Sequence, residues 1–188
     1  MIKLAILASG NGTNAQQISE HFADNEKVKV DCIIYNRKDA YVAERAKNLG
    51  IPAVYYGRKD FFENGKVLAY LQSRNIDWII LAGFLWLVPE EILSAFPNHI
   101  INIHPALLPK YGGKGMYGHH VHEAVIANQE KESGITIHIV DNHYDRGTTL
   151  FQAKCQLTES DTPDTLAEKI HLLEKKYFPI VIEKTILE

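Results

Sequence analysis

The first hundred residues alternate short apolar runs with segments that have helical spacing, and this alternation limits the fold more than any other feature. The runs are apolar on both faces, which is typical of strands in the middle of a covered parallel sheet. They are Lys3–Ala8, Val28–Tyr35, Ala53–Tyr56, Trp78–Ala82 and Ile100–Ile103. Helices are predicted between them, at residues 15–22, 40–49, 61–73 and 89–96. Four strand–helix units in succession predict an α/β fold with a doubly wound, mostly parallel sheet.

The pattern changes after Pro105. Residues 107–118 contain four glycines and a proline, which predicts a loop over the ligand-binding edge of the sheet. A helix is predicted at residues 119–128. The last helix is predicted from residue 162 to about residue 177, with a resumption after Pro179.

Two further strands are predicted in this second half. Ile135–Val140 alternates the polar residues Thr136 and His138 with isoleucines, which indicates a half-buried strand in an antiparallel or mixed region. Thr149–Leu157 is the strand that returns beside it. The sheet is therefore expected to end in a mixed part, followed by a C-terminal helix.

Composition narrows the class of protein. The 188 residues, 46% of them apolar, suit one domain spanning residues 1–188. A net charge of -3 argues against a nucleic-acid binder but allows a small anionic ligand. No apolar run reaches the roughly 18 to 20 residues of a membrane helix. Cys32 and Cys155 lie in strand-like runs, which favours buried free thiols, and with no signal-peptide pattern we expect a cytoplasmic protein.

The turn after the first strand, Ser9–Asn14, is a candidate phosphate site. Its sequence S-G-N-G-T-N leads from a strand into a helix, so successive backbone donors and the positive end of the helix dipole would face a phosphate. A plain tight turn into a helix explains the pattern equally well. The turn lacks the third glycine of a dinucleotide fingerprint and the lysine of a P-loop, so a phosphomonoester is favoured over a dinucleotide.

The strand end at Asn102 and His104 is a candidate catalytic site. Residues two apart on a strand project to the same face, and Pro105 stops the strand directly after them. Histidine suits proton transfer near neutral pH, and a carboxamide N–H suits an oxyanion. From spacing alone, a histidine satisfied by a backbone carbonyl is the more probable explanation.

The acidic turn Asp141–Gly147 is a third candidate, because it could hold a carboxylate beside an imidazole and keep that imidazole protonated. Ordinary hairpin chemistry of Asp and Asn explains it at least as well. The histidines at 119, 120 and 122 lack the spacing of a zinc-binding helix and have no accompanying cysteines, so no metal is expected.

Five segments together resemble the phosphoribosylglycinamide formyltransferase family, within the folate-dependent formyltransferases. They are A-I-L-A-S-G-N-G-T-N at residues 5–14, L-A-G-F at 81–84, I-N-I-H-P-A-L-L-P-K-Y at 101–111, S-G-I-T-I-H-I-V at 133–140 and D-x-x-x-D-x-G at 141–147. The N-x-H-P-x-L-L-P part is shared with other folate formyltransferases. Within this resemblance, the S-G-N-G-T-N turn points to the nucleotide-phosphate member of the superfamily.

The resemblance implies a Rossmann-like formyltransferase fold and a role for each motif. It assigns the substrate phosphate to Gly12, Thr13 and Asn14, the ribose to Glu174, and catalysis to Asn102, His104 and Asp145. It assigns the folate to Leu85, Trp86, Leu87, Val88, Val140, Asp141 and Asp145. Residues 1–100 would then form a phosphate-binding half, and residues 101–188 a catalytic and folate-binding half.

The resemblance also implies the reaction: a formyl group passes from 10-formyltetrahydrofolate, a co-substrate, to the amine of glycinamide ribonucleotide in purine biosynthesis. The partners would be these small molecules, with no nucleic acid, membrane or metal, in a monomer or homodimer. The alternatives are a formyltransferase acting on a sugar nucleotide or methionyl-tRNA, and a non-catalytic nucleotide-binding module of the same fold.

Two features depart from the family pattern. Trp86 stands where many members have an arginine or another polar residue beside the folate. The loop 112–120 is longer than in some members, and its glycines suggest a mobile flap or an ordered surface loop.

Overall fold

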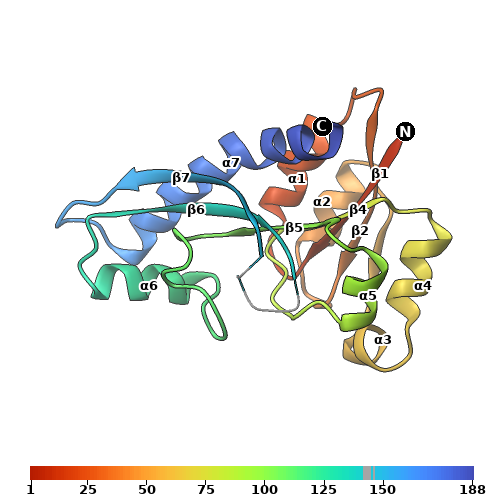
Figure 1. Cartoon of the computed structure of the whole chain (residues 1–188), viewed down its shortest axis with the longest axis horizontal. Helices are drawn as coiled ribbons and strands as arrows, with labels where there is room; N and C mark the ends of the chain where they lie inside the picture. The colour runs from red at the N-terminus through yellow and green to blue at the C-terminus, as the bar shows by residue number, and fades with distance from the viewer. Residues whose placement is uncertain (142–144, 146) are drawn as a thin grey trace. The chain divides into compact units, whose positions relative to one another are not determined.

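A seven-stranded sheet with the strand order β3-β2-β1-β4-β5-β6-β7 organises the protein (Figure 1). The structure is a computed structural model that describes residues 1–141, 145 and 147–188. Four residues of the predicted acidic turn, Asn142, His143, Tyr144 and Arg146, lie outside the described residues. The chain divides into two units, Met1–Ile101 and Asn102–Glu188. The functions predicted for the two halves stay predictions at this stage.

The first unit contains the predicted succession of strands and helices. Its elements are β1 (Ile2–Ala8), α1 (Thr13–His21), β2 (Val28–Tyr35), α2 (Val42–Asn48), β3 (Ala53–Tyr55), α3 (Arg58–Phe62), α4 (Lys66–Ser73), β4 (Trp78–Leu81) and α5 (Glu90–Ala95). Strand β1 pairs in parallel with β2 and with β4, and β2 pairs in parallel with β3. The residues from Leu4 to Ala8 are completely buried, as expected for a strand covered on both faces. The parallel doubly wound part of the prediction is confirmed.

The strand β5 (Ile100–His104) crosses the boundary between the units, and the second unit continues with α6 (His119–Ala127), β6 (Glu132–Ile139), β7 (Thr149–Gln156) and α7 (Pro163–Leu187). Strands β6 and β7 are antiparallel, which confirms the mixed C-terminal part of the sheet. Helix α7 packs against β6, β7 and α6. Its N-cap is Thr162, whose side chain accepts a hydrogen bond from the backbone N–H of Thr165 at 3.2 Å.

Two predicted helix boundaries were wrong. The helix predicted at 61–73 is two helices, because Gly65 takes a left-handed φ of 63° between α3 and α4. Helix α7 does not end near residue 177 but continues through Pro179. A proline inside a helix removes one backbone hydrogen bond, and complete burial of Phe178 and Ile182 on either side offsets that cost.

Neither cysteine is bonded to another: Cys32 is buried and Cys155 is half-buried. Burial raises the pKa of the Cys32 thiol to about 12, so the sulfur stays protonated at neutral pH. Within the described chain, no helix has both the length and the apolar character needed to cross a bilayer.

A buried histidine on α6 makes folding sensitive to acid. The side chain of His122 is 4% exposed, and its Nδ1 has no hydrogen-bond partner among the described residues. Burial, reinforced by neighbouring histidines, lowers the pKa of His122 from 6.5 to about 4. The unfolded chain therefore binds a proton at His122 below about pH 6.5, while the folded chain does so only below about pH 4.

We predict that the stability contribution of His122 is fully present above about pH 6.5 and is lost as the pH falls towards 4. The difference in pKa corresponds to about 3 kcal/mol. Urea unfolding of His122→Leu between pH 7.5 and 4.5 should show a correspondingly smaller loss of stability than wild type. His120→Leu, on the same helix but with a side chain 62% exposed, is the control and should keep the wild-type pH dependence. An unchanged pH dependence in His122→Leu would contradict the prediction.

Candidate active site

The glycine turn, Ser9–Asn14 in the first unit, takes its shape from the close approach of helices α1 and α2. Gly12 caps α1 with a left-handed φ of 79°, and its backbone C=O accepts a hydrogen bond from Gln16 N–H at 2.9 Å. A Cβ atom at this position would collide with the Val42 side chain of α2. Only glycine therefore satisfies both the φ angle and the contact. The first backbone N–H groups of α1, at Thr13 and Asn14, consequently lie at this turn, and N–H groups at the start of a helix can bind an anion.

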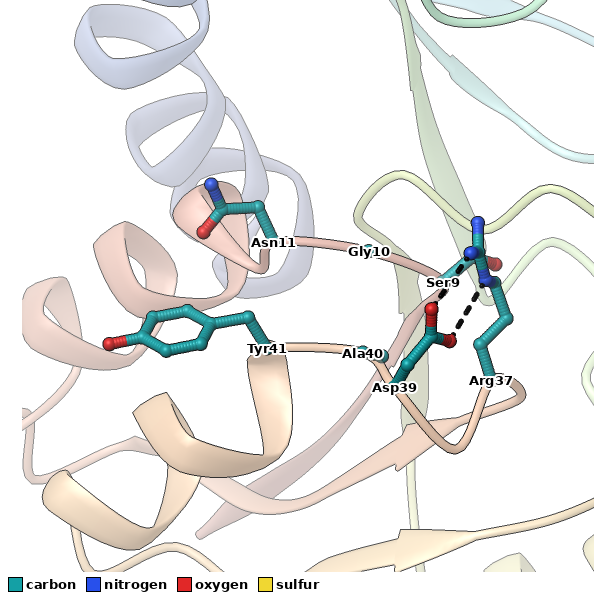
Figure 2. Close-up of a pocket in the computed structure, with 7 residues that line it drawn as sticks. All are labelled: Ser9, Gly10, Asn11, Arg37, Asp39, Ala40 and Tyr41. Atoms are coloured by element: carbon teal, nitrogen blue, oxygen red, sulfur yellow. Dashed lines mark hydrogen bonds and ion pairs between the residues drawn. The ribbon is translucent and has the colours of Figure 1, made fainter.

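A pocket of about 240 Å³ adjoins the glycine turn in the first unit. Residues Ser9, Gly10 and Asn11 form one wall, and the segment from Arg37 to Tyr41 forms the other. Figure 2 shows the Arg37 and Asp39 side chains pointing toward each other, with Asn11 and Tyr41 at the opposite end. Arg37 Nη2 and Asp39 Oδ2 are 3.1 Å apart in an exposed ion pair.

The segment predicted to contact folate in the first unit lies beside the same turn. Backbone N–H of Leu85 donates to Ser9 Oγ at 2.9 Å, and Ser9 N–H donates to the backbone oxygen of Gly83 at 3.0 Å. The structure thus brings the predicted folate segment next to the strand end that carries the predicted phosphate turn.

Side chains alternate along that folate segment. Leu85 and Leu87 are exposed, by 43% and 37%, and Val88 is buried. Trp86 instead packs into an aromatic cluster, with its ring 5.4 Å from Phe61 in an edge-on arrangement. The two leucines are therefore the most exposed apolar side chains of this segment, while Trp86 is half-buried.

In the second unit, the structure brings the three predicted catalytic residues into one group, in which His104 is buried and Asn102 and Asp145 are half-buried. Asn102 and His104 lie on β5, and His104 is 3% exposed. His104 Nδ1 is 3.6 Å from Asp145 Oδ2, an ion pair when the imidazole is protonated. The backbone of Asp145 has a left-handed φ of 52°, a conformation that is uncommon for residues other than glycine.

His138 on β6 joins this group and was missed as a functional residue. Its Nδ1–H donates to the backbone oxygen of Ile139 at 3.0 Å, and its Nε2 lies 3.1 Å from Asn102 Nδ2 and 3.8 Å from Asp145 Oδ1. The carbonyl can only accept, so Nδ1 carries the proton and Nε2 accepts one from the carboxamide. The sequence did contain a signal for His138: the alternation with isoleucines placed Thr136 and His138 on the same face of one strand.

The start of the loop after β5 also contacts the group. His104 Nε2–H donates to the backbone oxygen of Tyr111 at 2.7 Å, and the backbone N–H of Gly113 donates to Asp145 Oδ2 at 2.9 Å. Gly112 between them has no room for a side chain, since a Cβ would lie 2.6 Å from Leu108 Cδ2. The loop therefore orients both the imidazole and the carboxylate.

Two opposing effects set the charge of His104. Burial lowers the pKa of His104 below 6.5, while the Asp145 carboxylate and the hydrogen bond to Tyr111 raise it. The net direction is downward, so burial outweighs the carboxylate. Because Nε2 donates to a carbonyl, a neutral ring would face Asp145 with an Nδ1 lone pair; protonation at Nδ1 removes that repulsion.

The other predicted residues of the second unit are placed as follows. Val140 and Asp141 are half-buried directly after β6. Glu174 on α7 is buried, with 8% of its surface exposed. His119 and His120 pair with Glu123 at the start of α6, at 3.7 and 3.3 Å. In the described part of the chain, no group of three or more His, Cys, Asp or Glu side chains is arranged to hold a metal ion.

Comparison with known proteins agrees with this architecture. The family model for formyl transferase matches residues 2–182. The chain is 39% identical over 95% of its length to phosphoribosylglycinamide formyltransferase of Arabidopsis thaliana chloroplasts and spans 64% of that relative. It is 35% identical to the Haemophilus influenzae enzyme of the same name, covering 97% of the chain and 86% of the relative. The crystal structure of glycinamide ribonucleotide transformylase 1 from Symbiobacterium toebii superposes with a TM-score of 0.89 at 32% identity, covering 97% of this chain and 86% of the other.

The fold and the group around His104 define the class of protein: a doubly wound α/β protein that carries an imidazole, a carboxylate and a carboxamide at the end of a strand. Within that class, the chain belongs to the formyl transferase family.

We predict that the Asp145 carboxylate supports protonation of His104. In Asp145→Asn, the pKa of His104 should fall further below its usual value, because the favourable charge is lost and burial remains. Titration of the His104 imidazole by NMR measures this directly. Asp164→Asn, in the same unit with a side chain 90% exposed, should leave the pKa of His104 unchanged. The same pKa of His104 in Asp145→Asn and wild type would refute the assignment.

Proposed function

We propose that this protein transfers the formyl group of 10-formyltetrahydrofolate to the amine of glycinamide ribonucleotide, a step of de novo purine biosynthesis. One observation carries the proposal: Asp145 and Asn102 lie in one group with the buried His104, in a chain of the formyl transferase family. The relatives in Arabidopsis thaliana and Haemophilus influenzae are phosphoribosylglycinamide formyltransferases, which supports the choice of acceptor.

The proposed reaction proceeds by attack of the neutral acceptor amine on the formyl carbon, which gives a tetrahedral intermediate with a negatively charged oxygen. Asn102 Nδ2 carries two hydrogens, of which His138 accepts one, and the other is assigned to this oxygen. Burial disfavours the imidazolium form of His104 in the empty site, but a negative charge that develops beside the ring favours it, and the imidazolium then adds positive charge beside the oxyanion. Donors of this kind are each worth about 3 kcal/mol in comparable sites.

Asp145 has two roles in this proposal. It stabilises the protonated form of His104 against the effect of burial. It also orders a water molecule that carries a proton from the attacking nitrogen to the leaving nitrogen. No covalent intermediate on the protein and no metal ion is required.

Gly12, Thr13 and Asn14 are assigned to the acceptor's phosphate, because α1 begins there and the first N–H groups of a helix favour an anion. Glu174 is assigned to the ribose hydroxyls, for which a carboxylate is a suitable acceptor.

The folate residues proposed from sequence have side chains that suit a pterin and its benzoyl tail. Leu85 and Leu87 present apolar surface, and the Asp141 carboxylate can accept hydrogen bonds from the amino and ring N–H groups of a pterin. Val88, Val140 and Asp145 stay in the proposed set. Trp86 is assigned to support of this segment through its aromatic cluster.

The proposed partners are the two small molecules alone, without nucleic acid or membrane, and the protein would act in the cytoplasm as a monomer or homodimer. A sugar nucleotide or methionyl-tRNA as acceptor, or nucleotide binding without catalysis, are the outcomes that would replace this proposal. A competition assay over these amine acceptors distinguishes them.

The main test is product formation by the purified protein with 10-formyltetrahydrofolate and glycinamide ribonucleotide. His104→Ala should lower kcat by about 10²- to 10⁴-fold, the range of general acid–base catalysis, because no imidazole is left to take up a proton and stabilise the developing oxyanion. His120→Ala removes an exposed imidazole of α6 and should keep wild-type turnover. Wild-type protein that binds both ligands by calorimetry but forms no product would refute the proposed function.

A second prediction concerns the oxyanion donor. Asn102→Ala should lower kcat by about 10²- to 10³-fold, with little change in KM for the folate, because the amide bonds the oxygen only when charge develops on it. Steady-state kinetics with each substrate varied in turn separates these effects. If Asn102→Ala changed KM and left kcat intact, Asn102 would have a binding role instead.

A further inference from the structure

The Arg45 side chain on α2 forms hydrogen bonds to residues on both sides of Gly12 in the glycine turn. Its Nε–H donates to the backbone oxygen of Asn11 at 2.8 Å and to Asn11 Oδ1 at 3.2 Å, and its Nη2 donates to Asn11 Oδ1 at 2.6 Å. Its Nη1 donates to Gln16 Oε1 in the first turns of α1. The guanidinium thus connects the residue before Gly12 to the helix that begins after it.

Neighbouring contacts hold this arrangement in place. The guanidinium carbon lies 5.1 Å from the centre of the Tyr41 ring, which limits its rotation. Gln16 is itself held, since its Nε2 donates to Glu20 Oε1 at 2.7 Å. Val42, one helical turn before Arg45, donates its backbone N–H to the oxygen of Gly10 at 3.1 Å and fills the space beside Gly12. One face of α2 therefore fixes the turn from Gly10 to Gly12.

These contacts determine where the backbone donors point. A trans peptide is planar, so its C=O and N–H point in opposite directions. Arg45 holds the C=O of the Asn11–Gly12 peptide, and the N–H of Gly12 must therefore point away from the Arg45 guanidinium. The hydrogen bond from Val42 to the oxygen of Gly10 aims the N–H of Asn11 in the same manner.

The charge of Arg45 contributes as well. Asn11 and Gln16 accept through uncharged oxygens, so these hydrogen bonds do not neutralise the guanidinium. The positive charge adds to that of the N-terminal end of α1 at the turn. Both effects favour a doubly charged phosphate over an uncharged hydroxyl.

We propose that Arg45 is a positioning residue that makes this protein selective for a phosphorylated acceptor, by aiming the N–H of Gly12 and adding positive charge. This rests on the proposed function, in which Gly12, Thr13 and Asn14 bind the acceptor's phosphate. Arg45 acts through Asn11 and the turn, and it has no part in the chemistry of formyl transfer.

The test compares Arg45→Ala, Arg45→Lys and the control Lys47→Ala, which removes an exposed positive charge from the same helix. Arg45→Ala should raise KM for glycinamide ribonucleotide and the inhibition constant of inorganic phosphate by about tenfold or more, with kcat within threefold of wild type. For Arg45→Lys, both constants should lie between those of wild type and Arg45→Ala, since lysine keeps the charge but cannot form hydrogen bonds to both Asn11 oxygens at once. For Lys47→Ala, both constants should stay within about twofold of wild type.

The affinity for unphosphorylated glycinamide riboside distinguishes a loss of phosphate binding from a loss of structure that weakens binding of any acceptor. This affinity should be the same in Arg45→Ala and wild type, because Arg45 favours binding of the phosphate only. An equal loss for riboside and ribonucleotide, or an Arg45→Ala variant that behaves like Lys47→Ala, would overturn the proposal. If Arg45→Ala does not fold, Asn11→Ala replaces it; its increase in KM should be smaller and should not add to that of Arg45→Lys.

Failure of the proposed function gives a different result. In that case wild-type protein forms no formylated product. Calorimetric titration with inorganic phosphate then still tests Arg45, because tighter phosphate binding by wild type than by Arg45→Ala needs no turnover.

Discussion

The proton on His138 Nδ1 sets the direction of the hydrogen bond between His138 and Asn102, on which the proposed catalytic group depends for its oxyanion donor. A backbone oxygen fixes that proton, because the carbonyl of Ile139 can accept and never donate. The opposite ring nitrogen must then accept from Asn102, which orients the carboxamide with its nitrogen toward the group. A main-chain atom of β6 thereby decides which way a side chain of β5 presents its donors.

The sheet was predictable because its signal is local. Leu4–Ala8 is buried on both faces, and a parallel strand covered on both faces appears in the sequence as a continuous run of apolar residues. The helix boundaries failed where a longer-range effect decided them. Gly65 divides a segment whose apolar spacing continues across it, and α7 passes Pro179 because burial of flanking side chains outweighs the lost hydrogen bond. Neither outcome can be read from periodicity alone.

The catalytic group was predictable only in part. Asn102 and His104 follow from the period of a strand, but the carboxylate that faces them comes from a distant turn, and only the resemblance to a family connected the two. His138 was overlooked because a polar residue in an alternating strand is normally a solvated one. Here that face turns inward, and the side chain is 2% exposed. Trp86 was assigned to the folate from the resemblance; its ring contacts Phe61, Phe62 and Phe84, and its part in folate binding stays a prediction.

The contact between Gly12 and Val42 has a consequence for how this protein can vary. The turn and the second helix share one packing surface, with no space for a methyl group between them. Residue 42 therefore sets the limit on residue 12, although thirty residues of chain separate them. A glycine turn transplanted into another scaffold would lose its shape without this helix. The turn and this helix thus form one structural unit, and substitutions in one are expected to be tolerated only alongside substitutions in the other.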